Sequence, residues 1–168
     1  IRVLERANAA FTGATSKCFE PTRNQIKRAC KRCGIETPKG IVVRTQADVH
    51  RAVKRLRFPL FVKHHNSYAS IDISRRSRVV SKSGLMIQAK KFIARHGAAM
   101  IEEYIEGEEC TVLVAENPRD AARPIVYPPV RYQFPKGDAF KTEDLKWETF
   151  EGLGTQRVTN AKLVGRLR

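Results

Sequence analysis

Lys63 and the residues after it are of types that could act on a triphosphate. Lys63 lies at the end of the apolar run FPLFVKH, and a loop of small polar residues, Asn66 to Ser70, follows. A lysine at a strand end beside exposed loop N–H groups can neutralise phosphate oxygens. An isolated lysine in such a place is more often an ordinary edge residue, so its interpretation depends on the other segments.

An acidic turn, MIEEYIEGEECTV at 100–112, is the second such segment. Glu102 and Glu103 end an apolar strand, Gly107 follows in the turn, and Glu109 leads into another strand. Backbone groups at such a hinge could read the edge of adenine, and the Glu109 carboxylate could accept hydrogen bonds from ribose hydroxyls. Taken alone, the segment is equally typical of an acidic surface turn.

Two further segments contribute cationic residues. Lys146 lies between Leu145 and Trp147 beyond an acidic loop, where it could clamp a terminal phosphate as charge is transferred. Arg23 and Lys27 stand one helical turn apart in TRNQIK. The four segments occur in an order that a triphosphate site would need.

The elements that must position these residues follow from apolar spacing and capping residues. We expect helices at 21–33, from Thr45 to about Leu56, and from Leu85 to near Gly97. We expect strands at 40–44, 58–64, 71–80, 98–105, 110–116 and 124–132, the last at an edge because prolines interrupt it. This α+β pattern is expected to comprise the end of an N-terminal region at 1–19, a small lobe at 20–105, and the start of a second lobe at 106–168.

The charge of the chain restricts its partners. The net charge is +15, and residues 1–101 carry 22 Lys or Arg against 5 Asp or Glu, whereas residues 102–168 carry 10 against 12. Such a field attracts nucleic acid, a membrane surface or nucleotide phosphates. Charge alone favours nucleic acid, but no aromatic platform interleaves the basic residues. No apolar run reaches the roughly 18 residues of a membrane span, so we expect no membrane partner.

The cysteines indicate neither a metal site nor a redox site. Cys30 and Cys33 form a CxxC inside a predicted helix, and zinc would need two further ligands at a suitable spacing. We therefore expect buried thiols on a helix face, no metal ligands among these residues, and a reduced, cytoplasmic protein.

Five segments together resemble a known family. FTGAT, TRNQIKRACKRCGIETP, PLFVKHHNSYAS, MIEEYIEGEECTV and FKTEDLKWE follow the order and spacing of the D-alanine–D-alanine ligase type of the ATP-grasp superfamily, from about Phe11 to about Trp147. The resemblance implies an α+β fold in which two antiparallel sheets grip ATP. The chain would cover the central domain and the start of the C-terminal domain. The family's reaction phosphorylates a carboxylate with ATP and lets an amine attack the acyl phosphate.

The resemblance also implies a role for each residue of the nucleotide site. Lys63 would meet the α- and β-phosphates. Glu102, Glu103 and Ile105 would form the adenine hinge, and Glu109 would hold the ribose.

At the phosphate end, Lys146 would approach the γ-phosphate from the loop that closes over the site. Ser70 matches the family's loop serine, and we count it with Lys146 as catalytic. Arg23 stands where the family usually has lysine, so a planar fork replaces a point charge at this ATP-binding position.

The chain also departs from the family pattern. Tyr68 and Asp72 stand where glycines are expected, and Asp72 would face the phosphates with the wrong sign. Magnesium ligands are expected beyond residue 168, and an N-terminal domain, through which a homodimer could form, is expected ahead of the chain. The expected partners are ATP and a small amino-acid or peptide substrate, and the chain alone is not expected to turn over. The alternatives are a basic nucleic-acid-binding module and a degenerate, non-catalytic ATP-grasp relative.

Overall fold

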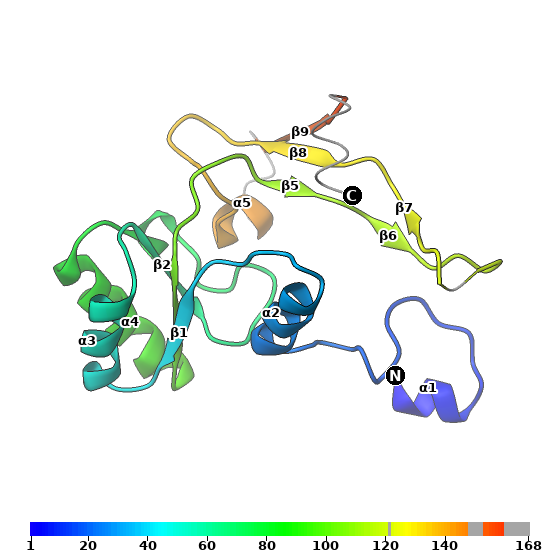
Figure 1. The fold of residues 1–168 in the computed structure, drawn as a ribbon, viewed down its shortest axis with the longest axis horizontal. Helices are drawn as coiled ribbons and strands as arrows, with labels where there is room; N and C mark the ends of the chain where they lie inside the picture. The colour runs from blue at the N-terminus through cyan, green and yellow to red at the C-terminus, as the bar shows by residue number, and fades with distance from the viewer. Residues whose placement is uncertain (121, 148–152, 160–168) are drawn as a thin grey trace. The chain divides into compact units, whose positions relative to one another are not determined.

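The protein forms two compact units in a computed structural model that describes residues 1–120, 122–147 and 153–159 (Figure 1). The units are Ile1–Lys39 and Gly40–Arg168. Neither bound coincides with the lobe boundaries expected at residues 19 and 105, which stay predictions.

The first unit contains two helices, α1 (Arg2–Arg6) and α2 (Arg23–Arg32). The Thr22 hydroxyl accepts a hydrogen bond from the Gln25 amide, and the Gln25 side chain accepts one from the Thr22 amide, so a capping box begins α2. The predicted helix is confirmed. The expectation of buried thiols is wrong, because α2 has no buried residue and Cys33 is exposed.

A four-stranded antiparallel sheet is the centre of the second unit. Its strands are β1 (Gly40–Val43), β2 (Leu60–His64), β3 (Arg78–Val79) and β4 (Ala99–Glu103), in the order β1-β4-β2-β3. In the register of β2 and β4, Phe61 lies opposite Glu102 and Lys63 opposite Met100. Directly opposed residues share a face of a sheet, so these four side chains lie on one face.

Two helices, α3 (Gln46–Arg55) and α4 (Lys82–His96), cover the other face of this sheet. A capping box between Thr45 and Asp48 begins α3, and Gly97, with φ +73°, ends α4. The residues that pack between sheet and helices form the core: Val43, Val49, Ala52, Leu56, Leu60, Val62, Val79, Leu85, Ala89, Phe92, Ala99 and Ile101. The core therefore leaves the face of Lys63 available for another role.

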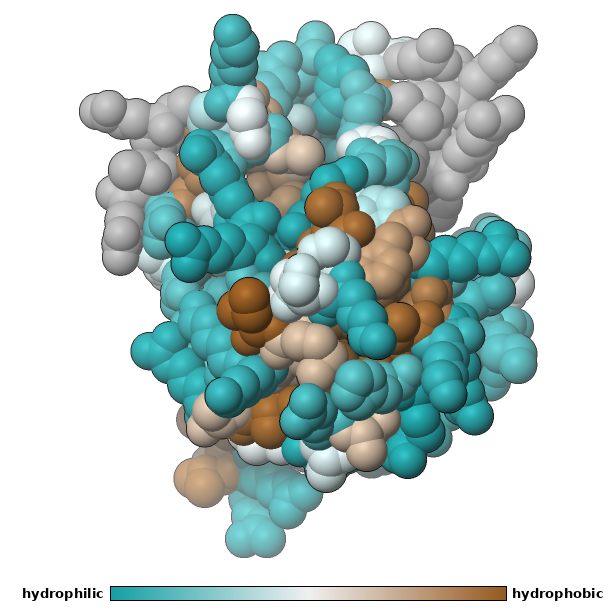
Figure 2. Space-filling view, turned by 90° about the vertical axis from the view of Figure 1, so that its left-hand side faces the viewer, coloured by the Kyte–Doolittle hydropathy of each residue, from teal (hydrophilic) through white to brown (hydrophobic). Residues whose placement is uncertain are grey.

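The side of the molecule shown in Figure 2 is largely hydrophilic with apolar patches between. A shallow groove between α3 and α4 is lined by Val49, Met86, Ile87 and Ile93 among others. None of the described helices has the length and apolar character needed to cross a membrane.

The strand expected at 71–80 is mostly absent. Only Arg78–Val79 forms a strand, and a 3-10 turn, η1 (Arg75–Ser77), precedes it. Ala69, Ser70 and Asp72 have φ values of +63°, +59° and +57°. A strand cannot pass through this left-handed region, so the segment forms a loop.

The remaining strands are short. β5 (Cys110–Thr111), β8 (Val130–Gln133) and β9 (Gly154–Arg157) form one antiparallel sheet, and β6 (Val114–Ala115) pairs with β7 (Ile125–Val126). Pro128 and Pro129 separate β7 from β8. The edge position expected for 124–132 is wrong for β8, which pairs with β5 on one side and β9 on the other and is the central strand of its sheet. A short helix, α5 (Glu143–Trp147), was not predicted.

The core can be tested with two substitutions on one helix. Phe92, 1% exposed, packs against the sheet, whereas Ile87 of the same helix is 70% exposed. Phe92→Ala should lower the free energy of unfolding by about 3–5 kcal/mol through cavity formation. Ile87→Ala should change it by less than about 0.5 kcal/mol. Urea unfolding measures both, and similar losses at the two positions would contradict this core.

Candidate nucleotide site

An ion pair between Lys63 of β2 and Glu102 of β4 lies at the centre of the candidate site. The Lys63 Nζ contacts the Glu102 Oε2, and the two side chains are 18% and 4% exposed. The antiparallel register places the two residues diagonally across neighbouring strands on the face away from the helices. A carboxylate this buried needs a cationic or hydrogen-bonding partner, and the lysine predicted to bind phosphate supplies one.

Gly40 makes room for this pair. It lies opposite Glu102 in the β1–β4 register. A Cβ atom at Gly40 would lie 2.6 Å from the Glu102 Cγ and 3.3 Å from its Oε1, closer than side chains tolerate. The glycine therefore leaves the space that the Glu102 side chain occupies.

The hinge residues follow Glu102 directly. The pairing of β1 with β4 ends at Gly40 and Glu102, and the Tyr104 amide donates to the Pro59 carbonyl at 2.9 Å. The Glu103 carboxylate accepts from the Arg57 amide at 3.0 Å, so the segment before β2 holds that side chain. Ile105 is 66% exposed. Glu103 and Ile105 could therefore bind a ligand through their backbone groups, and this adenine-binding role stays a prediction.

Three aromatic rings meet beside the ion pair. Phe61 stacks on Tyr104 with ring centroids 5.9 Å apart, and Phe140 packs edge-on against Phe61 at 4.9 Å. The Arg78 guanidinium lies 5.0 Å from the centre of the Tyr104 ring. Burial, with a smaller contribution from the Glu106 charge, raises the pKa of the Tyr104 hydroxyl. Sequence reasoning missed this cluster, although strand alternation places Phe61 on the face of Lys63.

Lys141 brings two predicted site residues together. The Ser70 hydroxyl donates to the Lys141 carbonyl at 3.2 Å, and the Lys141 amide donates to the Glu109 Oε2 at 3.4 Å. The Lys141 Nζ lies 3.4 Å from the centre of the Tyr132 ring. Ser70 and Glu109 are therefore joined through one residue that the sequence did not single out.

Lys146 lies in α5, close to the loop that carries Ser70. The indole N–H of Trp147, the next residue, donates to the Ala69 carbonyl at 3.1 Å. Leu145, on its other side, is buried, and Lys146 itself is partly buried. The structure thus brings α5 to the loop, as a γ-phosphate role for Lys146 requires.

Arg23 belongs to the first unit, at the start of α2. Its predicted contact with ATP stays a prediction.

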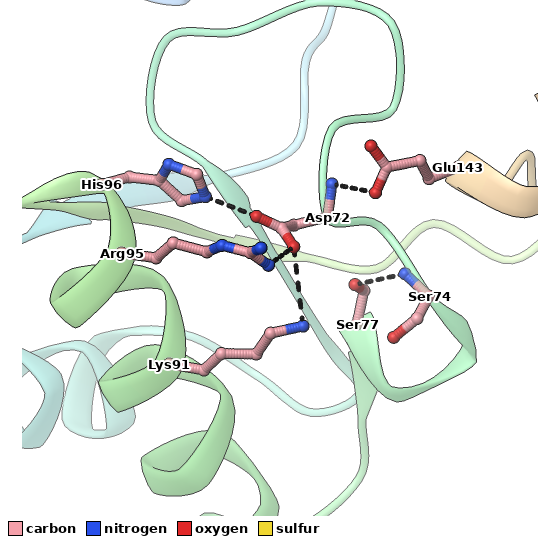
Figure 3. A network of polar contacts seen from close by, with 7 residues as sticks. All are labelled: Asp72, Ser74, Ser77, Lys91, Arg95, His96 and Glu143. Carbon is pink, nitrogen blue, oxygen red and sulfur yellow. Dashed lines mark hydrogen bonds and ion pairs between the residues drawn. The ribbon is translucent and has the colours of Figure 1, made fainter. Parts of the chain in front are cut away.

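The expectation that Asp72 would face phosphates is wrong. Figure 3 shows its carboxylate turned toward the last turns of α4. His96 Nε2 lies 2.6 Å from the Asp72 Oδ2, Lys91 Nζ lies 3.8 Å from the Oδ1, and Arg95 also contacts the Oδ1. Burial raises the pKa of Asp72, but the His96 contact and the charges of Arg95 and Lys91 lower it more, so the net shift is downward. The negative charge is neutralised within the small lobe.

Across residues 1–120, 122–147 and 153–159, no group of three or more His, Cys, Asp or Glu residues could hold a metal ion.

Comparison with known proteins identifies the family. The family model described as "D-ala D-ala ligase C-terminus" matches residues 30–134. The D-alanine–D-alanine ligase of Nitrosospira multiformis is 29% identical over 126 residues, which cover 73% of this chain and 39% of the relative. That of Ectopseudomonas mendocina is 30% identical over 115 residues, which cover 67% and 36%. The chain thus spans less than two fifths of the length of these relatives.

Solved structures agree on the fold. D-alanyl-alanine synthetase A from Vibrio cholerae superposes with a TM-score of 0.73 at 14% identity, covering 99% of this chain and 50% of that one. The D-alanine–D-alanine ligase from Bacillus anthracis complexed with ATP superposes with a TM-score of 0.65 at 20% identity, covering 94% and 46%. At such identities the likeness establishes the fold, which is that of the ATP-grasp ligases. Since the family model matches more than half of the chain, the chain belongs to the D-alanine–D-alanine ligase C-terminal family.

Proposed function

We propose that this chain is the ATP-binding part of a carboxylate–amine ligase that works through an acyl phosphate. The observation that carries the proposal is the Lys63–Glu102 pair on the sheet face opposite α3 and α4. Family membership supports it, and so does the ATP complex of the Bacillus anthracis relative.

Lys63 would neutralise the α- and β-phosphates. Its ammonium is held near the site by a carboxylate that cannot itself move into solvent, because the Glu102 side chain is 4% exposed. A ligand then meets a lysine whose position is already restricted, which reduces the entropy lost on binding. The phosphate oxygens would share the lysine with Glu102.

The adenosine half would lie against the hinge. Backbone groups of Glu103 and Ile105 would read the adenine edge, beyond the last residue pair of β1 and β4. Glu109, whose carboxylate accepts from the Lys141 amide, would also accept from a ribose hydroxyl. Carboxylates have several acceptor positions, so both interactions can coexist.

The reacting end would use Lys146 and Ser70. Lys146 would approach the γ-phosphate from α5, which already contacts the loop through Trp147. The Ser70 hydroxyl lies in the same loop and would orient the phosphoryl group or the acyl phosphate. A fixed cation stabilises charge that develops on the transferred group, and the amine of a second substrate would then displace phosphate.

Other parts of the proposal concern what accompanies this chain. Magnesium would neutralise further phosphate charge, with ligands other than the described residues. The substrates would be a small amino acid or peptide, the enzyme would act in the cytoplasm, and it could be a homodimer. Arg23 would contribute a further cation to ATP.

Lys63 gives the first test of this proposal. Lys63→Ala should weaken ATP binding by about 1.5–3 kcal/mol, as loss of a charge-assisted hydrogen bond does. Calorimetric titration measures the change. Lys54→Ala, which removes an exposed lysine of α3, should leave ATP affinity unchanged.

A second variant separates binding from folding. Lys63→Ala leaves the Glu102 charge buried without this cation, which is destabilising. Adding Glu102→Gln should recover thermal stability and leave ATP binding weak. If the double variant bound ATP as tightly as the wild type, Lys63 would have no phosphate role.

Nucleotide choice tests the hinge. Guanine reverses the donor and the acceptor at its six-position, so backbone reading at Glu103 and Ile105 should favour ATP over GTP. Competition of each nucleotide with a fluorescent ATP analogue measures the preference. Equal affinities would count against the hinge assignment.

A salt series distinguishes ATP binding from nucleic-acid binding, which the net charge of +15 keeps as the second candidate. A nucleic-acid binder would lose affinity for duplex DNA steeply as salt rises. It would also lose affinity when Lys27, Lys31 and Arg32 are neutralised. We expect this triple variant to bind ATP normally. Tight DNA binding that collapses in it, with ATP binding undetectable in the wild type, would reverse the assignment.

A further inference from the structure

The 66–74 loop is held at both sides by residues of other elements. On one side, the Asp72 carboxylate contacts Lys91, Arg95 and His96 near the C-terminal end of α4. The helix dipole favours cations at a helix C-terminus. The Asp72 carboxylate balances the positive charge of the basic side chains in the last turns of α4. Asp72 is 11% exposed at its side chain, so water screens these contacts only in part.

On the other side, the loop is joined to α5. The Asp72 amide donates to the Glu143 Oε2 at 2.8 Å, and the Glu143 amide donates to the Ile73 carbonyl at 2.9 Å. Trp147 donates to the Ala69 carbonyl. One residue, Asp72, therefore connects α4 through its side chain with α5 through its backbone (Figure 3).

The conformation held in this way is not one that the loop sequence favours. Ala69 and Ser70 have left-handed backbone angles, each of which costs about 1–2 kcal/mol for such a residue. Asp72 lies in the same region, which aspartate tolerates better than most residues. Contacts outside the loop must offset this strain. The Asp72 ion pairs are among these contacts, together with the hydrogen bonds that Glu143 and Trp147 make with the loop.

We propose that Asp72 is a positioning residue that tethers the 66–74 loop to α4 and thereby holds Ser70 in place for the triphosphate. The inference rests on the proposed function. Where the family pattern has a glycine, whose backbone can move freely, this chain has an electrostatic tether. The loop is then ordered before the nucleotide arrives, and the nucleotide need not order it on binding.

Substitutions at Asp72 separate the charge from the backbone. Asparagine keeps the size of aspartate and tolerates the left-handed region, whereas glycine removes the backbone strain altogether. If the tether is what matters, Asp72→Asn and Asp72→Gly should both weaken ATP binding, by roughly 3- to 10-fold, since partly exposed ion pairs contribute modestly. If strain relief mattered instead, Asp72→Gly would bind ATP at least as well as the wild type.

The opposite end of the ion pair gives a variant that leaves the loop sequence intact. Arg95→Gln removes the cation from α4 and should weaken ATP binding in the same direction by a smaller factor. The double variant with Asp72→Asn should bind no more weakly than Asp72→Asn alone, because both changes remove one interaction. Asp48→Asn is the matched control: it removes the charge of the Asp48–Arg51 pair on α3, while asparagine keeps an oxygen that can accept the capping hydrogen bonds. It should leave ATP affinity unchanged.

Trp147 reports on the tether without any nucleotide. It is the only tryptophan of the chain, and its indole contacts the loop at Ala69. The residue is 58% exposed, so release of the loop in Asp72→Asn acts mainly through loss of this hydrogen bond and should change the emission and increase quenching by acrylamide. Asp48→Asn should leave both unchanged.

The two measurements distinguish the failures. Unchanged Trp147 emission and unchanged ATP affinity in Asp72→Asn would overturn the tether while leaving the proposed function intact. ATP binding absent from the wild type would contradict the proposed function and, with it, the positioning role. We expect Asp72→Asn to alter the Trp147 emission and to weaken ATP binding. We also expect the losses of ATP affinity caused by Asp72→Asn and Arg95→Gln not to add up in the double variant.

Discussion

The buried carboxylate of Glu102 constrains the strand register, the residue at position 40 and the face on which the helices pack. A charge that is 4% exposed must be paired, and the pairing with Lys63 requires the antiparallel register that places Phe61 opposite Glu102. The same carboxylate requires glycine at position 40. The helices must then pack on the other face, where Leu60, Val62 and Ile101 are buried. Ion pair, register and core are thus parts of one arrangement.

Several basic residues of the chain are paired with carboxylates. Asp72 pairs with Lys91 and Arg95 of α4, Asp138 pairs with Arg75, and Glu106 pairs with Arg78. The carboxylates of the acidic turn therefore contact basic residues of the small lobe as well as of their own sheet, where Glu108 pairs with Arg131. These ion pairs hold loops in place, and the net charge of +15 remains.

The elements of the small lobe could largely be predicted from sequence. Thr22 and Thr45 each begin a helix with a capping box, Gly97 ends one, and the apolar runs form β2 and β4. These signals act over a few residues, so they are legible without tertiary structure. The pairing of Lys63 with Glu102 depends on register, which local pattern does not give.

The errors have the same origin. The sequence shows the residue type of Asp72 but not the direction of its side chain, so we expected it to oppose the phosphates. In the structure the backbone at Ala69 and Ser70 is left-handed, and the Asp72 carboxylate contacts α4. Phe140 reaches the candidate site by packing against Phe61 of β2, and Lys141 reaches it by contacting Ser70, 71 residues earlier in the chain. Such contacts exist only once the second unit has folded.

A crystal structure with a non-hydrolysable ATP analogue tests the central claim most directly. The account predicts the Lys63 Nζ within hydrogen-bonding distance of an α- or β-phosphate oxygen and the adenine edge against the backbone of Glu103 and Ile105. A nucleotide bound elsewhere, with the Lys63–Glu102 pair undisturbed and apart from it, would contradict the account.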